Sequence, residues 1–243
     1  MKVVFITILT SFTLMCSAQN LITPGSNAIE KKWIRNQSYT VQWYVLRDTA
    51  RIQMGEVTTK VERTKATVTI VTSVAMRNSK AQWTDSTVAR SADLGPIRHA
   101  SYNPQRNMVL NFGKTVTGFY EDRIKETRTA ISDAPTGSFF DSNIYPMLIT
   151  WLPLKEGLKQ EIPIYDYNPM GKIGIIRAWV KNVVSGTCTT EKSGDIGVWI
   201  VSVADEISSE GTSVTYYIAK SDRTLWKQEI SAAGRKMVML RAE

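Results

Sequence analysis

The chain has very few of the residues from which metal centres and nucleophilic active sites are built. It contains one histidine, His99, and two cysteines, Cys16 and Cys188. A zinc site normally needs three or four His, Cys or carboxylate ligands, and acyl-transfer catalysis needs a nucleophile, a base and an orienting group. No nucleophile-elbow pattern is present either. We therefore expect no metal, no cofactor and no enzymatic activity, with His99 as a structural or exposed side chain.

Long hydrophobic runs are also lacking. The apolar stretch over residues 3–15 is too short for a comfortable membrane span. It follows a positively charged start and leads to small residues up to Ala18, which is typical of a signal peptide over residues 1–18. We predict cleavage after Ala18, which would place the mature chain in the periplasm or outside the cell.

Lipidation of Cys16 is the alternative fate of this leader. A lipoprotein site normally has a small residue just before the cysteine and a leucine further upstream, where this chain has Met15 and Thr13. Lipidation is therefore disfavoured. Cleavage after Ala18 leaves Cys188 as the single cysteine, which excludes an intramolecular disulfide and favours a buried, small hydrophobic side chain.

Charge of one sign is not concentrated in any part of the chain. The formal net charge is +8, but the basic residues are scattered, which does not favour nucleic-acid binding. Weak attraction to anionic surfaces, including peripheral contact with a membrane, fits this charge better. The group Arg123, Lys125 and Arg128 is interpreted as a solvated face, or alternatively as a contact for lipid phosphate groups.

The sequence does contain a long series of strand patterns, which we assign to one domain over residues 19–243. Alternate residues along the first pattern are apolar: Tyr39, Val41, Trp43 and Val45. Such strands, with one polar face, indicate a sheet that is wetted on one side. About nine to twelve strands are expected, the last three of them as a meander over 214–241. Residues 19–36 are expected to pack on the outside of the domain.

One convincing helix is predicted between Asp141 and Trp151. Its apolar residues recur at helical spacing and form one stripe: Phe140, Ile144, Met147, Leu148 and Trp151. Pro146 is tolerable only in a first turn, and Pro153 ends the helix. We therefore predict a mainly β fold, in which a single large curved antiparallel sheet forms an incomplete β-barrel and one principal helix covers the concave face.

Tryptophans and paired acids suggest two further hypotheses. Exposure of Trp83, Trp179 and Trp226 would favour a module that binds a glycan or protein, although core packing is the usual role of aromatic residues in a sheet. A carboxylate-based hydrolase would need two acids facing one cleft. The adjacent pairs at 121–122 and 205–206 cannot provide them, because neighbours on a strand point to opposite faces, which leaves a pairing between acids that are distant in the chain.

Four segments in fixed order carry a family resemblance. They are the helix FDSNIYPMLITWL from Phe140, the turn LPLKEG from Leu152, the strand pair 173–184 and 195–204, and the hairpin from Tyr216 to Ile230. Together they resemble an uncharacterised family of exported bacterial proteins, which is similar to the periplasmic lipoprotein-localisation (Lol) carrier and its receptor. The resemblance implies an incomplete barrel around a helical cover, with a cavity that holds acyl chains in the carrier proteins.

These observations lead to one functional hypothesis and one alternative. We expect an exported, non-enzymatic protein that binds or carries a hydrophobic ligand, such as an acyl chain of an envelope lipid or lipoprotein, in envelope biogenesis. The predicted lining residues are Trp43, Val45, Ile144, Leu148 and Trp151. The alternative is an envelope module that binds a glycan or protein through an exposed aromatic sheet face.

Overall fold

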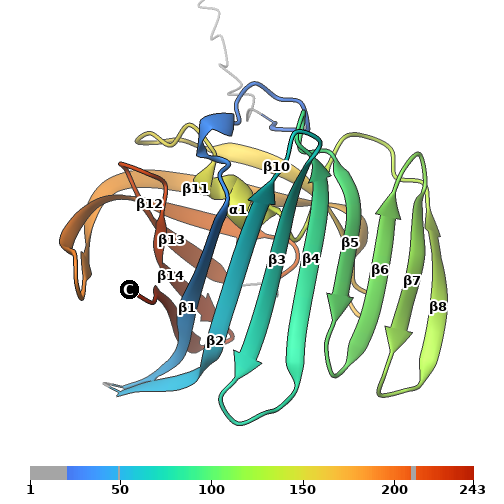
Figure 1. The fold of residues 1–243 in the computed structure, drawn as a ribbon, viewed down its shortest axis with the longest axis horizontal. Helices are drawn as coiled ribbons and strands as arrows, with labels where there is room; N and C mark the ends of the chain where they lie inside the picture. Colours follow the sequence, from blue (N-terminus) through green and yellow to red (C-terminus); the bar gives the residue numbers. More distant parts are fainter. Residues whose placement is uncertain (1–20, 49, 209–211) are drawn as a thin grey trace, which may run out of the picture.

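The fold is one large, strongly curved β-sheet (Figure 1). The computed structural model describes residues 21–48, 50–208 and 212–243; the predicted signal peptide and its cleavage site lie outside them. The sheet has 15 strands in the order β8-β7-β6-β5-β4-β3-β2-β1-β15-β14-β13-β12-β11-β10-β9. Within the described residues there is one α-helix, and no helix is long and apolar enough to cross a membrane.

The strands have the following bounds: β1 Gln37–Arg47, β2 Ala50–Arg63, β3 Thr67–Met76, β4 Gln82–Arg90, β5 Pro96–Tyr102, β6 Arg106–Phe112, β7 Val116–Asp122, β8 Thr127–Asp133, β9 Phe140–Asp141, β10 Gln160–Tyr167, β11 Ile173–Thr190, β12 Gly194–Asp205, β13 Ser213–Ala219, β14 Leu225–Ala232 and β15 Arg235–Arg241. A short 3-10 helix, η1, covers Lys31–Trp33, and α1 covers Tyr145–Thr150.

The topology is that of a barrel that does not close. Strands β1 to β8 follow one another as a meander, and β15 returns to pair with β1, with Val41 opposite Arg241. All pairings are antiparallel except that of β9 with β10. The two free edges, β8 and β9, are consecutive in the chain and are joined by residues 134–139 without pairing. The predicted curved antiparallel sheet is thereby confirmed.

The structure has more strands than predicted, because the sequence signal is ambiguous for β7 and absent for β8 and β9. Strand β8 is an edge strand in which only Ile131 is buried, so it shows no apolar alternation. In β7, Phe119 and Tyr120 are only half buried among charged residues. The two residues of β9 were assigned to the helix, although Phe140 and Asp141 pair with β10.

Helix α1 is shorter than predicted. It begins at Tyr145 rather than Asp141, with Pro146 in its first turn, where a proline is tolerated. Neither Asp141 nor Asn143 caps it; Ile144 occupies the N-cap position without a side-chain hydrogen bond. The helix lies within the concavity of the sheet, as predicted (Figure 1).

The core fills the concavity in two parts. The main cluster surrounds α1 and includes Leu148 and Ile149. It also contains Ile22, Ile29 and Ile34 from the N-terminal segment, which therefore packs into the core and not only on the outside as expected.

A second cluster joins the opposite walls of the sheet near its free edges. It contains Met108, Leu110, Val116 and Ile131 from β6 to β8, together with Tyr165 from β10. The rings of Phe112 and Tyr165 meet edge to face with centroids 5.7 Å apart. The concave faces are therefore packed together at this end, and the cavity under α1 lies outside this cluster.

Candidate functional site

A cavity of about 220 Å³ lies between α1, strands β1 to β3 and strands β13 to β15. Each wall contributes apolar side chains: Val41, Val57, Ile70, Met147, Leu225 and Met239. The alternation of β1 and β2 turns these residues inward, since side chains two apart on a strand share a face. The first turn of the helix contributes Pro146 and Met147 to the lining. The result is an apolar chamber with the short helix as its cover.

Apart from Lys227, the polar residues that line this cavity are neutral. The Tyr39 hydroxyl lies 3.3 Å from Met147 Sδ, and the Tyr216 hydroxyl bonds to Gln228 and Tyr145. Burial raises the pKa of both Tyr39 and Tyr216, so neither hydroxyl ionises near neutral pH.

Lys227 is the one charged residue among those that line the cavity, and its ammonium group contacts Glu229 and the Tyr217 ring. It lies 2.5 Å from Glu229 Oε1 and 4.4 Å from the centre of the Tyr217 ring. The cavity wall therefore offers a ligand apolar contacts and neutral hydrogen-bonding groups, but no formal charge of its own.

The five predicted lining residues occupy three different places. Ile144, Leu148 and Trp151 are at most 1% exposed and belong to the main core cluster, so they hold the helix in place and do not line the cavity. The helical stripe was broad enough to face both the core and the cavity, and periodicity could not separate the two sides.

The two predicted residues on β1 lie further along the same strand face. Val45 lines a second cavity of about 360 Å³ together with Ile52 and Met54. Trp43 stands between Val41 and Val45 and faces Met239 in register. Val41 therefore lines the first cavity and Val45 the second, and Trp43 lies between them without lining either.

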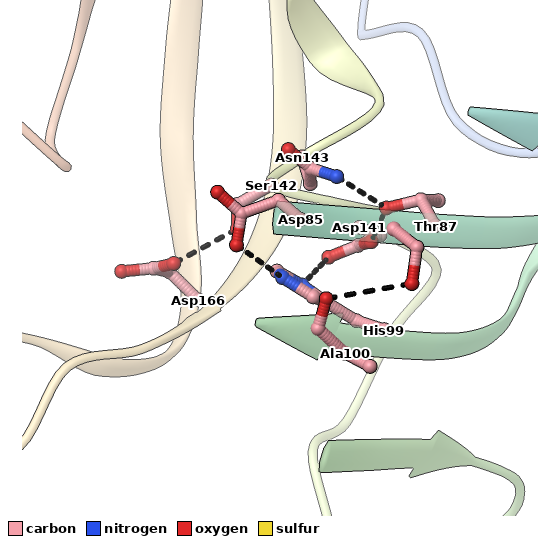
Figure 2. A network of polar contacts seen from close by, with 9 residues as sticks. Asp85, Thr87, His99, Ala100, Asp141, Ser142, Asn143 and Asp166 are labelled. Carbon is pink, nitrogen blue, oxygen red and sulfur yellow. Dashed lines mark hydrogen bonds and ion pairs between the residues drawn. The ribbon is translucent and has the colours of Figure 1, made fainter. Parts of the chain in front are cut away.

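A buried polar network, which no sequence pattern predicts, lies beside the cavity (Figure 2). His99 on β5 is 5% exposed, and its Nδ1 lies 2.8 Å from Asp141 Oδ1. Thr87 on β4 donates a hydrogen bond to the other oxygen of Asp141. On the far side, His99 Nε2 lies 4.0 Å from Asp85 Oδ1. The histidine is therefore held between two carboxylates from different parts of the chain.

Electrostatics keep this histidine charged. Burial alone lowers the pKa of His99, but the charge and hydrogen bond of Asp141, followed by those of Asp85, outweigh it and raise the pKa to about 10. An imidazolium that keeps its proton at neutral pH cannot act as a general base. The network is thus suited to joining chain segments rather than to proton abstraction.

The segments that it joins lead directly into the helix. Asn143 Nδ2 donates to Thr87 Oγ1 at 3.0 Å, and Ser142 Oγ donates to Asp166 Oδ1 at 2.8 Å (Figure 2). Asn143 also lines the cavity. The network therefore fixes residues 141–143 against β4, β5 and β10, and through them the start of the cavity's cover.

The three tryptophans of the alternative hypothesis do not line the cavity under α1. Trp83 is 40% exposed, whereas Trp179 and Trp226 are half buried, with cations 4.5 Å and 6.0 Å from their ring centres. Neither the two cavities above nor a third one, lined by residues that include Pro153 and Leu158, has a carboxylate in its wall. Among residues 21–48, 50–208 and 212–243, no group of three or more His, Cys, Asp or Glu side chains could hold a metal ion.

The fold and cavity define a barrel-like β protein with an internal apolar chamber. The chain belongs to the family DUF3108, described as a protein of unknown function, whose model matches residues 38–241. Among solved structures it is similar to a β-barrel-like protein of domain of unknown function DUF1849 from Brucella abortus, with a TM-score of 0.51 at 9% identity over 86% of this chain and 96% of that chain. At this identity the likeness shows the fold alone. No curated protein matches the chain.

Proposed function

We propose that the protein is a non-enzymatic binding protein that holds a hydrophobic ligand, such as an acyl chain, in the cavity under α1. The observation that supports this function best is the apolar lining of that cavity combined with its lack of formal charge. Ligand sites are typically lined by apolar side chains with a few polar groups that orient the ligand. Tyr39, Tyr216 and Gln228 would supply those groups.

The dimensions favour a slender ligand. Pockets for drug-sized molecules are about 300–1,000 Å³, so a chamber of about 220 Å³ suits a single chain better than a bulky ring system. Val41 and Val45, which line the first and second cavities respectively, are separated by about 13 Å at the rise of a strand. A chain that fills the first cavity could extend along β1 towards the second.

The cellular setting of this proposal comes from the sequence. The signal-peptide pattern supports a periplasmic or secreted protein, and the resemblance to the Lol carrier supports an acyl chain of an envelope lipid or lipoprotein as the partner, with a role in envelope biogenesis. The alternative, a module that binds a glycan or protein through exposed aromatic residues, has less support. Trp83 is the most exposed of the three indoles it requires, and Trp179 and Trp226 are half buried.

The proposal is tested by filling the cavity. In Val57→Phe the larger side chain would occupy the space where the ligand lies, and the affinity for a fluorescent fatty acid should fall by about tenfold or more. Val184→Phe is the matched control, because Val184 is 44% exposed and lies outside the cavity. No uptake of the probe by the wild-type protein, together with no lipid in native mass spectra, would overturn the proposal.

A further inference from the structure

Arg241 places a guanidinium group against the wall of the cavity. Its Cζ lies 4.3 Å from the centre of the Tyr39 ring and 6.0 Å from that of Trp226. In the sheet it faces Val41, and it follows Met239 by two residues on the same strand face. Tyr39, Val41 and Met239 line the cavity and Arg241 does not, so the guanidinium contacts the cavity wall through Tyr39.

This guanidinium lacks an acceptor. Its Nη1 is buried and has no hydrogen-bond partner, and no carboxylate of the described residues forms an ion pair with it. Burial lowers the pKa of Arg241, but a guanidinium remains charged at any physiological pH. Arg241 as a whole is partly exposed, but a buried donor without a partner is costly, so its unpaired Nη1 requires an explanation.

The acid whose charge acts on Arg241, Asp222, already has a partner. Its Oδ2 lies 3.3 Å from Arg35 Nη2. Stacking on Tyr39 engages the flat face of the Arg241 guanidinium and leaves the N–H groups at its edge free to donate. The described residues therefore provide cation–π contacts for Arg241 but no ion pair, whereas Arg35 has one.

We propose that Arg241 binds the anionic group, a carboxylate or a phosphate, of an amphiphile whose chain occupies the cavity under α1. The assignment rests on the proposed function, because it names the class of ligand for the same site. The planar guanidinium can donate two parallel hydrogen bonds to either group. Among the described residues, Lys227 lines the cavity but is paired with Glu229, so Arg241 supplies the unpaired cation that could recognise the polar end of a bound chain.

The test compares probes of equal chain length by isothermal titration calorimetry: decanoate, decyl phosphate and methyl decanoate, with inorganic phosphate as the chain-free anion. We expect wild-type protein to bind decanoate or decyl phosphate about tenfold or more tightly than the neutral ester, the gain expected for hydrogen bonds to a charged group. Inorganic phosphate alone should not bind. If it binds and depends on Arg241, the site takes a free anion and the amphiphile is excluded.

Substitution then assigns the preference to one residue. Arg241→Met keeps a flexible side chain over Tyr39 and removes the charge, so decanoate affinity should fall by about tenfold while ester affinity stays unchanged. Arg98→Met is the matched control, because Arg98 is exposed on β5. If Arg241→Met does not fold, the wild-type comparison of acid with ester still decides.

Two failures are distinguishable. If acid and ester bind wild-type protein equally, the headgroup site is wrong and the proposed function stands. If no probe with a chain binds, the proposed function itself is wrong.

Discussion

His99 Nδ1 lies 2.8 Å from Asp141 Oδ1, and this contact joins the middle of one sheet wall to the two-residue strand at the sheet's far edge. The two residues are 42 positions apart in the chain. Asp141 is followed by the segment that leads into α1, so the position of the cavity's cover depends on an ion pair that lies outside the cavity lining. The pair therefore couples the stability of the sheet to the position of that cover.

Asp141→Asn should destabilise the fold strongly. The substitution removes the nearer negative charge from a buried imidazolium, and breaking a buried ion pair costs about 3–5 kcal/mol. Urea unfolding, monitored by tryptophan fluorescence, would measure this loss in the free energy of unfolding. The matched change Asp195→Asn, on an exposed residue, should stay within about 0.5 kcal/mol of wild type. Equal effects of the two substitutions would contradict a structural role for the pair.

Stability should decline as pH rises above neutrality. The pKa of His99 is about 10 in the folded protein, against 6.5 for the ordinary side chain. Between these values the folded state binds more protons than the unfolded state, so each rise in pH favours unfolding. The contribution of His99 is complete below pH 6.5 and is lost as pH rises towards 10.

His99→Gln isolates that dependence. It removes the titrating group, so the difference in unfolding free energy between wild type and variant should be largest at low pH and shrink between pH 6.5 and 10. A difference that stays constant over this range would show that the histidine is not held in its charged form. Titration of the imidazole by NMR provides an independent measurement of the same pKa.

Periodic patterns in the sequence predict much of this fold. The alternation of Tyr39, Val41, Trp43 and Val45 indicates one face of β1, because side chains two apart on a strand share a face; Tyr39 and Val41 line the cavity, and Val41 is the buried residue of the strand. Where that physical basis is missing, prediction fails. Strand β8 has one buried residue, Ile131, and so carries no such signal.

The polar network and the surroundings of Arg241, by contrast, could not be predicted from periodic patterns. Asp141, Thr87 and His99 come together only when the sheet curves, and no spacing in the chain indicates that they meet. Arg241 likewise looks like any other basic residue near a C-terminus. Its position over Tyr39 follows from the pairing of β15 with β1, which are the last and first strands in chain order.

Cys188 should react slowly while the protein is folded. It is 8% exposed, and burial raises the pKa of its thiol, so little of the reactive thiolate is present at neutral pH. We expect alkylation by iodoacetamide, followed by mass spectrometry, to be at least about tenfold slower in buffer than in concentrated urea. Equal rates in the two conditions would show that the distal end of the β11–β12 hairpin is open to solvent.

Gly118 should not tolerate a side chain. It lies in β7 opposite Leu110, with a φ of 153°, and a Cβ built there would meet the carbonyl oxygen of Val109 at 1.8 Å. Because that obstacle is backbone, Gly118→Ala should destabilise the protein by about 1–3 kcal/mol in urea unfolding. Gly197→Ala is the matched control, since a Cβ at Gly197 meets nothing within 4 Å and its φ is unstrained. That change should be neutral or slightly stabilising, because alanine restricts the unfolded chain. A loss of stability at Gly197 equal to that at Gly118 would mean that the close approach of β6 and β7 is not the cause.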